Sequence, residues 1–136
     1  MTIDQIFLIL ALILLFGLIF GSVYFLPIFI TILRSRNNGL NLNFKQGKFL
    51  VKNHCVRKEF LIGTYEIWKI YPVQLDKLVN HFHAGGDLIN QRIGISAMTE
   101  RNKEPNINML TALDLAKHDL NRAVEKAEKN KWRFEF

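Results

Sequence analysis

Few side chains in this sequence could perform chemistry, and they are scattered along it. The single cysteine, Cys55, follows His54, and two further histidines, His81 and His83, lie two positions apart. Residues two apart on a helix point to different faces, so His81 and His83 cannot chelate one metal ion together. His54 and Cys55 have no partner at the spacing of a metal site. We therefore expect packing or surface histidines and no bound metal.

The acidic residues give no stronger sign of catalysis. Asp114 and Asp119 fall within a helical pattern, with Lys117 and Arg122 nearby, so we expect them to cap helices or form ion pairs. The sequence contains no nucleotide-binding loop, no Gly-x-Ser-x-Gly motif and no paired-cysteine metal motif. The sequence therefore predicts a protein that is not an enzyme and that needs no cofactor.

The N-terminal region predicts a membrane segment. No charged side chain occurs from Ile6 to Leu33, and roughly 20 apolar residues suffice to span a bilayer as a helix. The alternative, a cleaved signal peptide, would have a basic start, a shorter apolar stretch and small residues at its end. Pro27 divides the apolar run, and the segment 27–33 either continues as a kinked helix or turns along the interface. A shallow hairpin is the less favoured alternative.

Two features of this segment bear on its neighbours. Gly17 and Gly21 form a small-xxx-small pattern that lets a second helix approach closely, although such patterns are also common by chance. Arg34 and Arg36 follow the span and no basic residue precedes it, which favours an external N-terminus and a cytoplasmic C-terminal part. A single cysteine fits that reducing compartment.

The part after the membrane segment is basic. It contains all 18 Lys and Arg residues against 11 of the 12 acidic residues, so 18 − 11 gives a formal charge of +7. Next to a bilayer, Arg34, Arg36, Lys45 and Lys48 are expected to attract anionic headgroups. Nucleic-acid binding is less favoured, because no zinc-finger, helix-turn-helix or RNA-binding signature accompanies the charge.

The pattern divides the chain into a membrane segment with its basic flank (1–37), a β-like segment (38–71) and a helical unit (72–136). In 38–71, alternating apolar residues and a turn at 45–48 predict strands. The stretch 56–71 is either strand or interfacial helix. The predicted fold class is thus a single transmembrane helix followed by a small α+β domain.

In 72–136 we predict a helix that starts near Pro72 and ends at Gly85 and Gly86. Asp87 then caps a second helix with Ile89, Ile93 and Ala97 on one stripe, and Asp119 caps a break in a third helical region from Asn106 to Asn130. The tail, with alternating Trp132, Phe134 and Phe136, is either a final strand or an exposed docking peptide.

Two motifs in the helical unit resemble the bacterial flotillin-like A family of membrane scaffold proteins. The first is His81-Phe82-His83-Ala84-Gly85-Gly86, which is similar to the family's His-aromatic-x-Ala-Gly-Gly element. The second consists of 112–116, with Asp114, Leu115 and Ala116, followed by Asp119-Leu120 and Ala123-Val124. The spacing of the motifs also fits, as does Phe-Leu-Pro-Ile at 25–28. The resemblance covers roughly 23–33 and 75–130, whereas 38–71 matches poorly and Lys117 replaces a family glycine.

The family's stomatin–prohibitin–flotillin domain and coiled coil are absent from this sequence. The resemblance therefore implies only the family's membrane-proximal portion, in a bacterial inner membrane. We expect a structural or accessory subunit that contacts membrane lipids and other membrane protein subunits in a hetero-complex. The alternative is a basic domain that binds anionic lipid headgroups or nucleic acid at the membrane surface.

Overall fold

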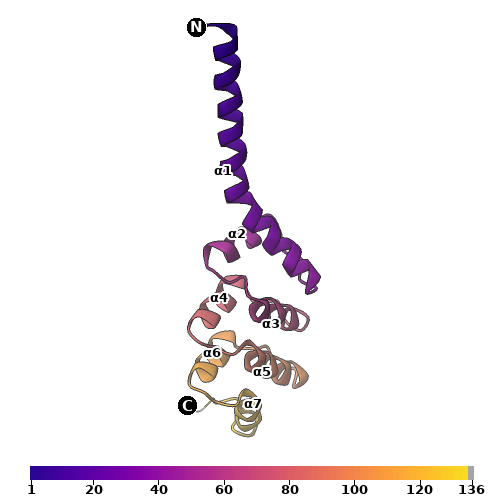
Figure 1. The fold of residues 1–136 in the computed structure, drawn as a ribbon. Helices are drawn as coiled ribbons and strands as arrows, with labels where there is room; N and C mark the ends of the chain where they lie inside the picture. The colour runs from indigo at the N-terminus through magenta and orange to yellow at the C-terminus, as the bar shows by residue number, and fades with distance from the viewer. Residues whose placement is uncertain (135–136) are drawn as a thin grey trace.

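The structure, a computed structural model, describes residues 1–134 of the chain, and in that part the only regular secondary structure is α-helix. It contains one long N-terminal helix and six shorter ones below it (Figure 1). The helices are α1 (Ile3–Asn37), α2 (Phe44–Lys52), α3 (Lys58–Trp68), α4 (Leu75–His83), α5 (Leu88–Glu100), α6 (Ile107–Leu115) and α7 (Leu120–Lys129). No strand occurs in residues 1–134, so the predicted α+β domain is wrong.

Helix α1 is long and apolar enough to cross a membrane, and its most apolar 18-residue stretch is not buried in the protein. Thr2 begins the helix with a capping box in which its hydroxyl accepts a hydrogen bond from the backbone N–H of Gln5. The helix continues through Pro27 and bends in its C-terminal half (Figure 1). This confirms the prediction that the segment 27–33 continues as a kinked helix. Pro27 lacks an N–H group, which weakens the backbone ladder at this level.

The six shorter helices follow one another as three helix–turn–helix pairs: α2 and α3, α4 and α5, and α6 and α7. The pairs stack mainly through their second helices, α3 against α5 and α5 against α7. In Figure 1, α2, α4 and α6 form one column and α3, α5 and α7 form a second. The first helices start at residues 44, 75 and 107, at intervals of 31 and 32 residues. An interval of this size is typical of helical-repeat proteins, in which each helix pair buries its apolar face against the next pair.

The turn inside each pair also repeats. His54, Gly85 and Lys117 occupy the left-handed region, with φ of 55°, 85° and 64°. In each turn the next residue donates its N–H to a carbonyl five positions earlier, at 2.9–3.0 Å, as in a Schellman motif. The predicted helix stop at the Gly-Gly pair is confirmed at this place, and Asp87 caps α5 as predicted.

Close contacts at glycines hold the layers together. A Cβ atom placed on Gly63 of α3 would lie 2.8 Å from the Cβ of Leu88, the first residue of α5. A Cβ atom on Gly94 of α5 would lie 2.9 Å from Cδ1 of Leu120, the first residue of α7. Any larger side chain would therefore push the second helices of successive pairs apart.

The residues that suggested strands in 38–71 form α2 and α3 for identifiable reasons. Asn43 and Gln46 make a capping box that starts α2, and Gly47 lies inside that helix instead of in a turn. In α3 the buried residues Phe60, Thr64 and Ile67 recur at three- and four-residue steps, which is a helical period. Only the short connector with buried Leu40 and Leu42 keeps the alternation that suggested a strand.

Outcomes for the remaining helical predictions are mixed. The third region does break at Asp119, which caps α7. Of the three residues predicted on one stripe of α5, Ile89 and Ile93 are 64% and 40% exposed, whereas Ala97 is buried. In the tail, Trp132 and Phe134 pack on the core without forming a strand, and Phe136 lies outside the described residues.

The repeated turn predicts opposite changes in stability for substitutions at two equivalent positions. Gly85→Ala places a Cβ in the left-handed region and should lower the unfolding free energy by about 1 kcal/mol. Lys117→Gly, at the equivalent position of the next pair, should raise it by a similar amount because it removes that cost. Urea unfolding of the full chain in neutral detergent, followed by circular dichroism, measures both. Changes of the same sign in the two variants would contradict the equivalence of the turns.

Candidate functional site

The best-defined polar site lies between the second and third helix pairs, at His81 and Asp114. His81 occupies the position in α4 that Leu50 has in α2 and Leu113 has in α6, because each carbonyl accepts the repeated turn hydrogen bond. The imidazole is therefore buried in the core, and its side chain is 0% exposed. A Cβ atom on Gly86 would clash with Cε1 of this ring, so only glycine fits there.

Asp114 on α6 gathers the partners of this site. Its Oδ2 atom lies 2.8 Å from Nε2 of His81 and accepts a hydrogen bond of 2.7 Å from the backbone N–H of Asp87. Its Oδ1 atom accepts a 2.6 Å hydrogen bond from the side-chain amide of Asn90. The same amide donates to the carbonyl of His118, and its oxygen accepts from the N–H of Leu120. The cluster thus joins α4, the start of α5, α6 and the start of α7.

The electrostatics of the pair favour a structural role. Burial lowers the pKa of His81, and the nearby carboxylates of Asp114 and Asp87 oppose that shift without reversing it. The folded protein therefore holds a neutral imidazole at neutral pH. Both side chains are shielded, at 0% and 3% exposure, so neither can reach a substrate from solution. The arrangement resembles an acid–base pair in distance but lacks the access that catalysis needs.

A second side-chain contact, between a cysteine and a histidine, joins the first two helix pairs. Sγ of Cys55 lies 3.2 Å from Nε2 of His83, a spacing seen in nucleophilic dyads. The same Nε2 atom lies 2.6 Å from the carbonyl of Asn53, which can only accept a hydrogen bond, so this nitrogen carries the proton. Cys55 is fully buried, and burial raises the pKa of its thiol. A protonated, buried thiol without a base is not an activated nucleophile.

The other residues of the family-like motifs form the turns around this cluster. Ala84 and Ala116 are the C-caps of α4 and α6, and Asp119 is the N-cap of α7. Leu115 is partly exposed on α6. Sequence reasoning gave Asp119 its capping role correctly, but it missed both the pairing of His81 with Asp114 and the contact of Cys55 with His83. The signal that could have found the first pairing is a polar residue at a core position of the repeat.

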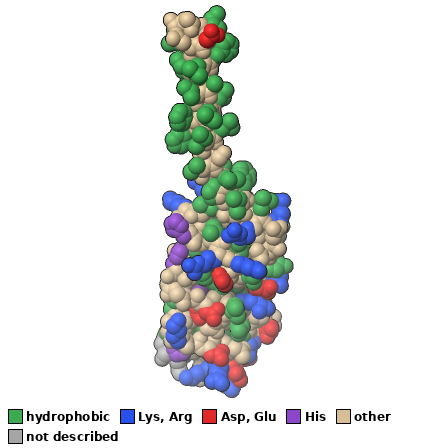
Figure 2. Space-filling model, in the orientation of Figure 1, with side chains coloured by type: hydrophobic (Ala, Val, Ile, Leu, Met, Phe, Trp, Pro, Cys, Tyr) green, Lys and Arg blue, Asp and Glu red, His purple; other side chains and the backbone are tan. Residues whose placement is uncertain are grey.

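The predicted membrane-surface residues lie at the junction of α1 and α2. Figure 2 shows Lys and Arg side chains directly below the apolar stalk, whereas acidic side chains of the domain on this face lie farther away. Arg34 reaches the carbonyl of Val56 at 3.5 Å, and Arg36 is exposed near the end of α1. Lys45 and Lys48 are exposed on α2, together with Lys52, which the prediction omitted.

At Gly17 and Gly21 an added Cβ would meet no atom within 4 Å. In residues 1–134 no group of three or more His, Cys, Asp or Glu side chains is placed to hold a metal ion. The chain matches no protein-family model, and no curated protein and no solved structure is similar to it at a significant level. The resemblance to the flotillin-like A family therefore stays a prediction.

The buried cluster predicts a large difference between two aspartates. Asp114→Ala leaves the N–H of Asp87 and one of the two N–H groups of the Asn90 amide without their acceptor, so it should lower the unfolding free energy by about 3 kcal/mol. Asp119→Ala removes an exposed helix cap and should cost about 1 kcal/mol. Urea unfolding of both full-length variants measures the difference. Equal losses would show that the Asp114 cluster does not hold the helix pairs together.

Proposed function

We propose that this chain is a non-enzymatic, membrane-anchored accessory subunit that binds other membrane proteins. The observation that carries the proposal is a set of exposed apolar side chains on α3 and α5, in the column formed by α3, α5 and α7. Ile62 of α3 is 39% exposed, and Ile89 and Ile93 of α5 are 64% and 40% exposed. Ile62 precedes Gly63 and Ile89 follows Leu88, and Gly63 and Leu88 meet where α3 packs on α5. Exposed apolar groups of this kind are typical of protein interfaces.

The fold supports a binding role, although fold alone does not establish function. Stacked helix pairs present a continuous side surface, which helical-repeat proteins use to hold partners. Gly17 and Gly21 offer a second contact inside the membrane, where a flat helix surface lets another helix approach. The flotillin-like motifs point in the same direction, toward assembly at a membrane. Few surfaces of this short domain suit a large homo-oligomer, so a hetero-complex is the preferred form.

The proposed location is a bacterial inner membrane, with the N-terminus outside and the helical domain in the cytoplasm. Arg34 and Arg36 at the end of α1 support this orientation. A cysteine placed at Thr2 should react with an impermeant thiol reagent from outside intact cells, whereas one placed at exposed Lys117 should not. Cys55 cannot report orientation because it is buried. The opposite labelling pattern would reverse the assignment.

The interface predicts which changes release the partner. In the Ile89→Gln/Ile93→Gln variant, a co-purifying membrane protein should be lost from gentle detergent extracts, because two apolar contacts are removed. Each exposed substitution should change stability by less than about 0.5 kcal/mol. Leu115→Gln, an equivalent exchange at a partly exposed site on α6, is the matched control and should retain the partner.

Gly17→Leu/Gly21→Leu tests the membrane contact in the same way and should also release the partner. Quantitative mass spectrometry of the purified complexes gives the ratio of partner to chain. Retention of the partner by all variants would remove the proposed interface. Recovery of the unaltered chain as a large ring or lattice without other proteins would favour a self-assembling scaffold instead.

A further inference from the structure

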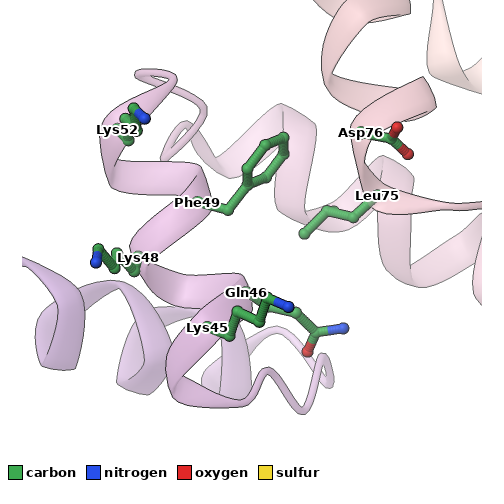
Figure 3. Close-up of a pocket in the computed structure, with 7 residues that line it drawn as sticks. All are labelled: Lys45, Gln46, Lys48, Phe49, Lys52, Leu75 and Asp76. Atoms are coloured by element: carbon green, nitrogen blue, oxygen red, sulfur yellow. The ribbon is translucent and has the colours of Figure 1, made fainter.

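A groove between α2 and α4 lies outside both the polar cluster and the proposed protein interface. Its volume is about 680 Å³, within the usual range of ligand sites. Phe49 of α2 and Leu75 of α4 point toward each other across the groove (Figure 3). Lys45, Lys48 and Lys52 come from α2, and Lys48 points away from Leu75, toward α1. Asp76 is the single acidic residue of the lining. The groove therefore combines an apolar floor with a basic rim.

The basic rim is free to bind an anion. Lys45, Lys48 and Lys52 are exposed, and their spacing of three and four residues puts them on one side of α2. None of the three forms an ion pair with a carboxylate in the described part of the chain. Helix α2 itself contains no acidic residue. Three positive charges thus lie on one side of α2, and Asp76, the acidic residue of the lining, forms no ion pair with them in the described part of the chain.

The groove lies beside the candidate membrane span. The Phe44 ring at the start of α2 lies 5.8 Å from the Phe25 ring and 6.3 Å from the Phe29 ring of α1. Nζ of Lys48 lies 5.7 Å from the centre of the Tyr24 ring. These residues belong to the last part of the apolar run, where a helix leaves the hydrocarbon for the headgroup layer. With this part of α1 at the membrane surface, the lysines would lie near the lipid phosphates.

The outer side of α1 near this point supports the same placement. Leu26, Phe29 and Leu33 are 55%, 52% and 57% exposed, whereas Ile28, Thr31 and Ser35 are buried. The buried residues include Ile28, which contacts α2 at Gly47, so the apolar outer side is left for lipid. This arrangement keeps α2 below an apolar surface that faces the bilayer.

We infer that this groove binds the phosphate headgroup of an anionic phospholipid from the surrounding bilayer. The lysine ammonium groups would hold the phosphate, and Phe49 and Leu75 would cover the glycerol and the first acyl carbons. A phosphate on a lipid reaches the groove at high local concentration, because α1 fixes the chain in the same bilayer. This site is independent of the proposed protein interface, which lies on α3 and α5.

The test uses the full chain in neutral detergent, titrated with phosphatidylglycerol or phosphatidylcholine and analysed by native mass spectrometry. We expect the unaltered chain to bind phosphatidylglycerol at least tenfold more tightly than phosphatidylcholine. Each lysine near a lipid surface contributes about fivefold, so Lys45→Gln/Lys48→Gln/Lys52→Gln should weaken phosphatidylglycerol binding by more than about tenfold. The three side chains are exposed, and circular dichroism should show unchanged melting of this variant.

The matched control is Lys117→Gln/Lys129→Gln/Lys131→Gln, which removes the same charge at the far end of the stack and should bind the lipid within about twofold of the unaltered chain. Equal losses in the two triple variants would mean non-specific charge attraction and would overturn the site. An absence of preference between the two lipids would overturn it as well. Tight binding of a soluble acidic peptide that depends on Lys45, Lys48 and Lys52, without binding of phosphatidylglycerol, would assign the groove to a protein ligand instead.

Discussion

The close approach of helices at glycine is the constraint on which the rest of the structure depends. Gly63 and Gly94 lie 31 residues apart, and each receives the leucine that begins the second helix of the next pair. Gly47 of α2 makes a similar close contact with Ile32 of α1, because an added Cβ would lie 2.8 Å from Cγ1 of Ile32. Because the helices touch at these points, one short domain can bury a continuous core through three pairs and join it to the apolar helix.

The polar cluster is a consequence of this repeat. A histidine stands at a core position that leucine fills in the neighbouring pairs, and a buried imidazole needs a polar partner. Asp114 supplies it and is in turn satisfied by Asp87 and Asn90. Gly86 is needed because the ring fills the space where a side chain would lie. The motif that resembles a family signature is thus explained here by packing and turn geometry, and no catalytic role is needed to account for it.

The sequence predicted those parts of the fold that depend on local signals. The apolar run, the caps at Asp87 and Asp119 and the left-handed turn at Gly85 follow from residue type alone. The strands predicted for 38–71 are wrong because alternating apolar residues and a possible turn at 45–48 suggested them, whereas Asn43 and Gln46 cap α2 and the buried residues of α3 recur at a helical period. The pairing of His81 with Asp114 depends on how the pairs stack, which no local pattern encodes. The repeat is not evident in the sequence because the three turns use different residues, His54, Gly85 and Lys117.

Thermal unfolding of Gly63→Ala and Gly94→Ala in the full-length chain tests the stacked-pair account most directly. Alanine is the better helix former by about 1 kcal/mol, so propensity alone would raise the melting temperature. The close contacts with Leu88 and Leu120 predict the opposite, a decrease of about 5 °C or more in each variant. Ser96→Ala, on the same helix as Gly94, controls for propensity and should leave the melting temperature unchanged or raised. Melting temperatures that stay constant or rise in both glycine variants would contradict the account.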